Sequence, residues 1–156
     1  MTTPADQTHD VALRALHVAP HLNRWIVARV SQNNLGGDLS FRQLTALYVI
    51  REESGTFGHL ARRLMVTPAV VTGIVDRLER RGYVQRVNDP EDRRRVRLAL
   101  TERGRAVSVA VEQALANEIA AGLASLSAQE MATLSRGLEV LDRVVAALDV
   151  PQPAPR

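Results

Sequence analysis

A chain of 156 residues with a formal net charge of +3 fits one domain of ordinary size, or a small domain with added helices. Hydrophobic residues make up 46% of it and aromatic residues only 3%, so the core must consist of leucine, valine, isoleucine and alanine, which favours helices. The chain has no cysteine, which excludes disulfides, thiolate zinc sites and a cysteine redox switch. No apolar run approaches the roughly 20 residues that span a bilayer, and no secretion signal is visible, so we expect a cytoplasmic, soluble protein without membrane contact.

The first predicted helix covers residues 8 to 32. Pro20 lies inside it, and because an interior proline costs about 3 kcal/mol or more, we expect a kink or a break near Ala19. The residues that can share its broad apolar face are Leu13, Leu16, Leu22, Ile26 and Val30.

Two further helices are expected before residue 67. The segment "SFRQLTALYVIREES" opens with Ser40 and Gln43 at capping-box spacing, which predicts the second helix. The segment "TFGHLARRLMV" predicts a short third helix that buries Leu60, Leu64 and Phe57.

The segment "VTPAVVTGIVDRLERRGY" carries the strongest helix signals in the chain. Thr67 is a good N-cap, Pro68 suits the first helical position, and Gly82 stands where a helix ends with glycine. The apolar residues at helical spacing, expected to form the buried stripe, are Val71, Ile74, Val75 and Leu78.

The segments "YVQRV" and "VRLAL" predict two short strands around the loop "NDPEDRRR", with Val96, Leu98 and Leu100 on one side of the second strand. A short helix, a tight connection, a capped helix and a two-stranded ribbon form a winged helix-turn-helix arrangement. We therefore predict a mainly α fold with a small β-hairpin wing.

The last part of the chain predicts two more helices. Thr101 is a plausible N-cap for a helix over residues 102 to 124, and a Ser127–Glu130 capping box opens a final helix to about Leu148. Residues 149–156, "DVPQPAPR", are expected to be a disordered tail. The apolar residues of the final helix form a coiled-coil-like seam, Met131, Leu134, Leu138, Leu141, Val145 and Leu148.

Basic residues are concentrated in one segment. All 20 are arginine. The segment from Arg62 to Arg105 contains twelve of them and only six acidic residues, a net charge of +6, whereas the rest of the chain carries a net charge of −3. Three consecutive arginines repel one another, and surface ion pairs contribute only about 0 to 1 kcal/mol each. A polyanionic partner, double-stranded DNA, explains this segment better than stability does.

The capped helix is expected to enter the major groove. Gly73 inside it costs about 1 kcal/mol relative to alanine, so close approach to the base pairs would explain the glycine. Thr72 is placed to contact a base edge or a thymine methyl, and Arg77 and Arg80 to flank phosphates. For Asp76 two roles stay open, orienting an arginine or accepting from a cytosine amine. The predicted DNA-binding residues of this segment are Thr67, Pro68, Ala69, Thr72, Gly73, Asp76, Arg77 and Arg80.

The loop between the strands is expected to reach the neighbouring minor groove. Pro90 starts its turn. Asp92 is predicted to brace Arg94 across the tip, while Arg93 and Arg95 meet phosphates.

The segment "DPEDRRRVRLALTERGR" resembles the wing signature of the MarR (multiple-antibiotic-resistance regulator) family, through Asp92, Arg94, Leu100, Thr101 and Gly104. The segment "LARRLMVTPAVVTGIVDRLERRGYV" resembles the helix-turn-helix of the same family. The resemblance implies a homodimeric bacterial or archaeal regulator, most simply a repressor, that binds a palindromic operator. It also implies dimerisation by the first and the last two helices, and release of DNA by a phenolic or other lipophilic acid.

We accordingly expect one domain over residues 1–156, with a DNA-binding lobe at 40–105 and dimerisation helices at 8–34 and 102–148. The expected dimer-interface residues are Leu13, Leu16, Leu115, Ile119, Leu134, Leu138, Leu141 and Val145. An effector pocket for an aromatic acid is expected at His17, His21, Trp25 and Tyr48. The alternative for the first three is simple packing in the dimer interface.

Other classes of function fit less well. His17 and His21 are spaced to share a metal, but Pro20 disturbs that turn and no third ligand is obvious, so we expect no metal and no cofactor. No nucleophile–base pair or phosphate-binding loop is visible, which argues against an enzyme. The remaining alternative is a helical dimeric adaptor that docks an acidic protein through its arginines, and such a protein would show neither a steep salt dependence nor a palindrome preference.

Overall fold

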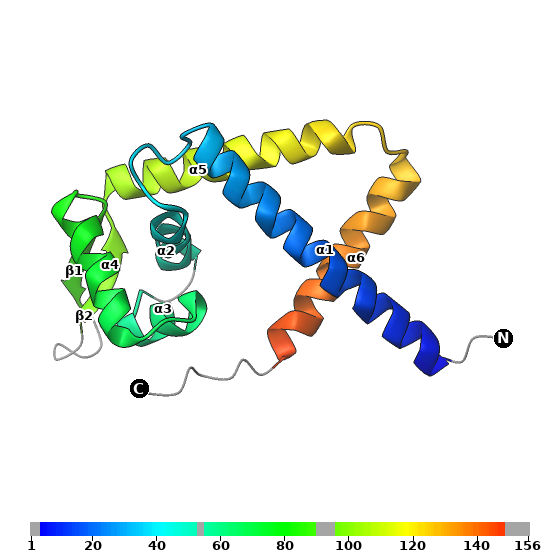
Figure 1. Ribbon diagram of the computed structural model, residues 1–156, viewed down its shortest axis with the longest axis horizontal. Helices are drawn as coiled ribbons and strands as arrows, with labels where there is room; N and C mark the ends of the chain where they lie inside the picture. The colour runs from blue at the N-terminus through cyan, green and yellow to red at the C-terminus, as the bar shows by residue number, and fades with distance from the viewer. Residues whose placement is uncertain (1–3, 53–54, 90–95, 149–156) are drawn as a thin grey trace.

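The computed structural model describes residues 4–52, 55–89 and 96–148, which form mainly helices and one antiparallel hairpin (Figure 1). The predicted fold class is confirmed. The elements in chain order are α1 (Pro4–Gln32), α2 (Phe41–Glu52), α3 (Phe57–Leu64), α4 (Pro68–Arg80), β1 (Val84–Asn88), β2 (Val96–Leu100), α5 (Glu102–Leu123) and α6 (Ala128–Ala147).

The elements from α2 to β2 pack together and form what we call the winged-helix lobe. Its core is mainly aliphatic, as the composition predicts, with Tyr83 also buried in it. Figure 1 shows α5 leaving this lobe as a long rod, with most of α1 and all of α6 lying beyond it. The largest fully buried side chains are Leu47, Leu60, Leu78, Val71, Val75 and Val84.

Helix α4 follows the sequence closely. All four residues of the predicted stripe are buried, and Gly82 ends the segment in the left-handed region with a φ of 71°. Thr67 does stand at the N-cap, but its side chain forms no capping hydrogen bond, contrary to expectation. The helix begins instead on the fixed φ of Pro68 and on the backbone bond from the Val71 N–H to the Thr67 carbonyl (3.1 Å).

The predicted starts of α2, α5 and α6 are confirmed. The Ser40 N–H donates to Gln43 Oε1 (2.9 Å) and the Gln43 N–H to Ser40 Oγ (3.3 Å). Thr101 Oγ1 accepts from the Gly104 N–H, and α6 opens with the complete capping box of Ser127 and Glu130. These starts depend on side chains within one turn of each other, which is why the sequence predicts them.

Helix α1 is longer than expected. It begins at Pro4 and runs through Pro20 to Gln32 as one helix, so a break near Ala19 is wrong (Figure 1). A proline removes one N–H donor and crowds one carbonyl in the preceding turn, and the turns on both sides keep their own bonds.

The hairpin pairs Val84 with Leu100 and Asn88 with Val96. Its first strand begins one residue later than expected. Leu98 is buried and Leu100 half-buried, whereas Val96, near the loop, is exposed.

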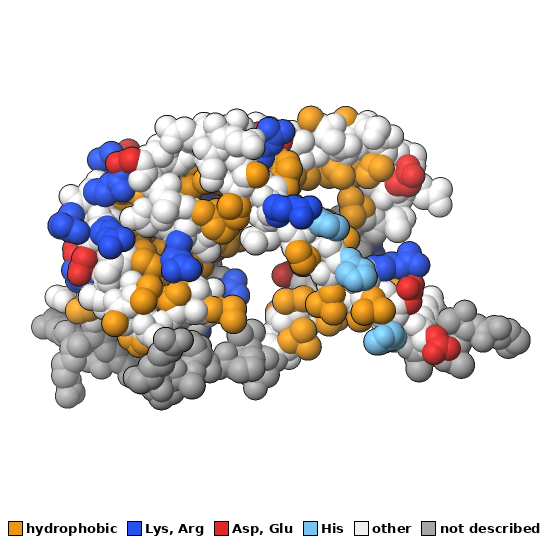
Figure 2. All heavy atoms as spheres, in the orientation of Figure 1, with side chains coloured by type: hydrophobic (Ala, Val, Ile, Leu, Met, Phe, Trp, Pro, Cys, Tyr) orange, Lys and Arg blue, Asp and Glu red, His pale blue; other side chains and the backbone are white. Residues whose placement is uncertain are grey.

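Helix α6 has no buried residue, and α1 before residue 25 has none among its described side chains. Figure 2 shows hydrophobic side chains gathered over this part of the molecule, away from the winged-helix lobe. None of the described helices has the length and hydropathy needed to cross a membrane.

Candidate nucleic-acid interface

The outer face of α4 presents small and basic side chains. Ala69, Thr72, Arg77 and Arg80 are exposed, as is Pro68, while Thr67, Gly73 and Asp76 are half-buried. The Thr72 hydroxyl donates to the Pro68 carbonyl (3.1 Å), which fixes the rotamer of this side chain on the helix. The predicted residues of this helix therefore share one surface.

Gly73 does not pack against any other part of the chain that the structure describes. Apart from the helix itself, a Cβ at this position would meet no heavy atom of the described residues within 4 Å. It borders a hollow between α2 and α4, together with Ser40, Arg42, Val70 and Arg77. The space in front of the glycine is thus open to a partner and flanked by two arginines.

Asp76 pairs with an arginine of the wing, which supports the first of the two roles left open, orienting an arginine. Its Oδ1 accepts from Arg86 Nη2 of β1 at 2.6 Å, and Glu79 pairs with the same guanidinium. The hydrogen bond to Asp76, followed by the charges of Glu79 and Asp76, raises the pKa of Arg86 against the effect of burial. These three residues, the α4–β1 clasp, join the wing to α4. Neither Arg86 nor Glu79 was among the predicted site residues, although Asp76 and Glu79 stand at i, i+3 on one helix face.

A second ion pair lies at the base of the wing. Arg97 Nε donates to Oδ2 of Asp89, whose side chain is only 5% exposed. Pro90, Asp92, Arg93, Arg94 and Arg95 lie outside the described residues. The brace from Asp92 to Arg94 and the phosphate contacts of Arg93 and Arg95 therefore stay predictions.

Some arginines of the basic segment bind acceptors within the chain. Arg81 pairs with Asp38, and Arg103 donates to the Tyr83 hydroxyl (3.0 Å) with its guanidinium 4.4 Å from that ring. Arg77 and Arg80 point outward, although Arg80 Nε also donates to the Asp76 carbonyl (3.3 Å). Figure 2 shows arginine side chains spread over the outer edge of the lobe.

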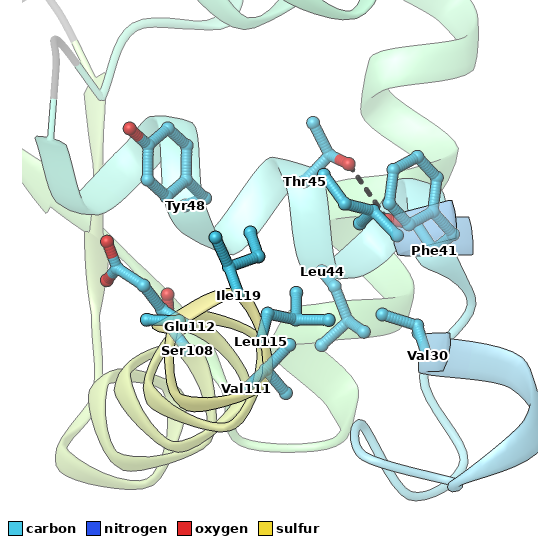
Figure 3. A pocket seen from close by; sticks show the side chains of 12 residues that line it. Val30, Phe41, Leu44, Thr45, Tyr48, Ser108, Val111, Glu112, Leu115 and Ile119 are labelled. Carbon is cyan, nitrogen blue, oxygen red and sulfur yellow. Dashed lines mark hydrogen bonds between the residues drawn. The ribbon is translucent and has the colours of Figure 1, made fainter. Parts of the chain in front are cut away.

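A cavity of about 380 Å³ lies between α1, α2 and α5 (Figure 3). Its walls are almost entirely apolar, with Ile26 and Val30 from α1 and Val111 from α5. The residues that α2 contributes are Phe41, Leu44, Thr45 and Tyr48. The cavity therefore touches both the winged-helix lobe and the long helices outside it.

The four residues predicted to form an effector pocket do not come together at this cavity. Tyr48 lines it, but His17 and His21 are exposed, and Trp25 is half-buried without lining it. The reason is helix geometry, because the row that faces the cavity is Ile26 and Val30, about 100° round α1 from the row of Trp25. Within the described residues no group of three or more candidate ligands could hold a metal beside the histidines.

Two residues predicted for the dimer interface line the cavity within the chain and so are not free to contact only a second copy. Leu115 is half-buried against the lobe core, and Ile119 also lines the cavity. The other predicted interface residues are all exposed: Leu13, Leu16, Leu134, Leu138, Leu141 and Val145.

Comparison with known proteins agrees with this geometry. A family profile described as MarR family matches residues 37–95. The transcriptional repressor NicR of Pseudomonas putida is 32% identical over 108 residues, which are 68% of each chain. The chain belongs to the MarR family.

Solved structures extend the match over the long helices. FabT of Streptococcus pneumoniae, solved in complex with DNA, is 26% identical with a TM-score of 0.68, over 88% of this chain and 99% of that one. A MarR family protein from Bacillus stearothermophilus has a TM-score of 0.75 over 92% of this chain and 99% of that one, and at 23% identity shows the shared fold. MarR family members are DNA-binding transcription regulators and not enzymes, so this chain is a DNA-binding transcription regulator.

Proposed function

We propose that this MarR family regulator is a homodimeric repressor that binds a palindromic operator and leaves it when a small molecule enters the cavity between α1, α2 and α5. The observation that carries the proposal is the outer face of α4, where Gly73, with open space in front of its Cα, lies between exposed arginines. NicR, named a transcriptional repressor, supports the direction of regulation. Because the partner is DNA, we place the protein in the cytoplasm.

In the proposed complex α4 lies in the major groove. Thr72, Ala69 and the backbone of Gly73 approach the base edges, while Arg77 and Arg80 contact phosphates on either side. The predicted arginines of the loop, Arg93 to Arg95, reach the next minor groove. Thr67 and Pro68 place the helix N-terminus, whose backbone N–H groups favour a phosphate. Asp76 contacts Arg86 and not the DNA.

The proposed dimer explains why α6 has no buried residue. Isolated amphipathic helices are marginal in water, and most helices in proteins are stabilised by packing of their apolar face. The exposed seam of α6 and the exposed leucines of α1 supply such a face on elements that the lobe does not cover. Two lobes joined in this way would present two α4 helices about one turn of DNA apart.

The direct test is selection of bound duplexes from a random library, followed by titration at several salt concentrations. We expect a palindromic consensus, and if six to ten phosphates are neutralised, affinity falls by about 10³ to 10⁵ between 50 and 200 mM salt. Equal affinity for scrambled duplexes or a flat salt dependence would instead favour the adaptor that docks an acidic protein.

The Thr72→Ala variant tests the role of α4 in the same selection. We expect the consensus to relax at one base position, by about 1 to 3 kcal/mol, with little change in the salt slope. Thr133→Ala on α6 is the matched control and should keep the full consensus. Identical consensus sequences for the unmodified protein and Thr72→Ala would overturn this role.

A further inference from the structure

Ser108 places an unpaired hydroxyl in a largely apolar cavity. Its side chain comes from α5, is 5% exposed and lines the cavity. Its Oγ has no hydrogen-bond partner among the described residues. A buried polar group without a partner costs about 1 to 3 kcal/mol, which a bound molecule with a donor or acceptor would recover.

The hydroxyl of Thr45, also in the cavity wall, already has a hydrogen-bond partner. Thr45 Oγ1 donates to the Phe41 carbonyl at 3.0 Å (Figure 3). Tyr48 is 43% exposed and so remains solvated at the edge of the cavity. Ser108 is therefore the buried position at which a ligand gains most from one hydrogen bond.

The charge beside Ser108 is negative. Glu112, one turn further along α5, lines the cavity and pairs with Arg51 of α2. Arg51 is not part of the lining, and its guanidinium already faces two carboxylates, Glu112 and Glu52. Burial acts to lower the pKa of Arg51, but its hydrogen bonds to Glu52 and Glu112 raise it overall, so the arginine stays charged.

These three groups together carry one net negative charge at the mouth of an apolar space. Arg51 Nη1 is buried without a partner among the described residues, but any anion that approached it would also approach Glu112 and Glu52. Figure 3 shows Glu112 and Ser108 on the same side of α5, facing the α2 residues across the cavity. An anionic ligand would lose its hydration in this cavity and would find no positive charge that is not already paired with carboxylates of the described residues.

We propose that the cavity selects an uncharged hydrophobic molecule with a single hydrogen-bonding group, which Ser108 binds, and that Glu112 discriminates against carboxylates. This inference rests on the proposed effector response of the same cavity. It replaces the aromatic or lipophilic acid that the family resemblance implies with a neutral phenol, alcohol or ketone of similar size. A volume of about 380 Å³ suits a molecule of one or two fused rings.

The test uses three probes that share one ring system: 2-naphthol, 2-naphthoate and naphthalene. Calorimetric titration of the DNA-free full chain at neutral pH measures binding, and fluorescence anisotropy of labelled operator measures release separately. We expect 2-naphthol to bind at least about tenfold more tightly than 2-naphthoate, since the carboxylate meets a site of like charge.

Two variants assign the selectivity to residues. Ser108→Ala should weaken 2-naphthol about fivefold and leave naphthalene unchanged, which is the effect of one net hydrogen bond. Glu112→Gln should narrow the preference for 2-naphthol over 2-naphthoate. Ser125→Ala, an exposed serine after α5, is the control and should change neither affinity. Ser108→Ala removes an unpaired hydroxyl, so it should fold at least as stably as the unmodified chain.

The outcomes separate the two proposals. Tighter binding of 2-naphthoate, or equal loss of 2-naphthol and naphthalene in Ser108→Ala, overturns the ligand class and leaves the cavity as an effector site. Selective binding of 2-naphthol without release of operator supports the ligand class and contradicts the effector response. If none of the three probes binds, both proposals fail.

Discussion

Gly73 and Asp76 lie three residues apart on α4 and have different roles. Among the described residues the glycine has no neighbour that a methyl group would touch, which fits the proposal that its role is in binding DNA. The aspartate has a structural role within the chain, because it forms an ion pair with Arg86 of the wing. A residue that weakens a helix without packing benefit marks a place where function and stability conflict.

Replacing Gly73 by alanine should expose this conflict. We expect the free energy of unfolding to rise by up to about 1 kcal/mol, since alanine is the better helix former and nothing obstructs its methyl group. Operator affinity should fall by about tenfold or more, because the methyl group stands between α4 and the base pairs. Urea unfolding and anisotropy titration measure the two effects.

Gly58→Ala on α3 is the matched control, because this glycine also has open space around it. It should leave operator affinity unchanged. If Gly73→Ala binds the operator as tightly as the unmodified protein, the backbone of Gly73 does not approach the DNA closely.

Helix starts are the clearest features at the level of single elements. Helix α6 owes its start to Ser127 and Glu130, although no residue of the helix is buried in the described chain. The Glu130 carboxylate accepts from the Ser127 hydroxyl (2.6 Å) and from the Ser127 N–H (2.8 Å). The hydroxyl bond first and the backbone bond second lower the pKa of Glu130 from its ordinary value of 4.5.

This pKa predicts a pH-dependent stability of α6. Because the folded pKa lies below that of the unfolded chain, the stabilisation is fully present above pH 4.5 and is lost as the pH falls through the folded pKa. Glu130→Gln keeps the spacing of the capping box but carries no charge. We expect the melting temperature of the unmodified protein to exceed that of Glu130→Gln near neutral pH, with the difference vanishing in acid. Circular dichroism melting curves measure this.

Asp142→Asn, an exposed acid in the body of the same helix, is the comparison and should not reproduce the trend. A difference between unmodified protein and Glu130→Gln that grows as the pH falls would contradict the sign of the argument.

At the level of the whole molecule, the exposed apolar face of α6 indicates a missing partner. Leu138 is 57% exposed and Val145 53% exposed in the described chain, and α1 exposes Leu16 by 68%. Contiguous apolar patches of this kind mark interaction sites in soluble proteins. In the proposed homodimer these residues become the interface between the two copies.

Leu138→Asp tests the dimer. In a single chain the new carboxylate would contact water, so the winged-helix lobe should keep its fold, whereas the dimer would bury an unpaired charge. We therefore expect sedimentation as a monomer at micromolar concentration, a retained helical spectrum and weakened binding to the palindrome.

Thr133→Asp introduces the same charge about 140° round the helix and should remain dimeric. A monomeric unmodified protein, or an unchanged dimer of Leu138→Asp, would contradict the proposed interface.

The sequence by itself determines the order of the elements, most of the helix starts and the buried stripe of α4. Capping boxes, the proline at the start of α4 and Gly82 at its end act through contacts within a turn, so neighbouring residues suffice to predict them. The stripe follows from helical periodicity alone. The exposed face of α4, which we propose contacts DNA, follows too, because the outer face of a helix is the complement of its buried face.

Contacts between distant residues were decided only by the tertiary structure. Arg86 and Asp76 are ten residues apart, and Arg51 and Glu112 sixty-one, so no local pattern predicts that they pair. The cavity shows the same limit, because its walls depend on the rotation of α1 and α5 against α2. Rotating α1 about its axis by the angle of one residue replaces Trp25 by Ile26 in the cavity wall. The spacing of His17, His21 and Trp25 along the sequence does not indicate this rotation. Ser108 had a visible signal, a serine at helical spacing from Val111 and Leu115, but only the packing of α2 on α5 shows that its hydroxyl is buried without a partner.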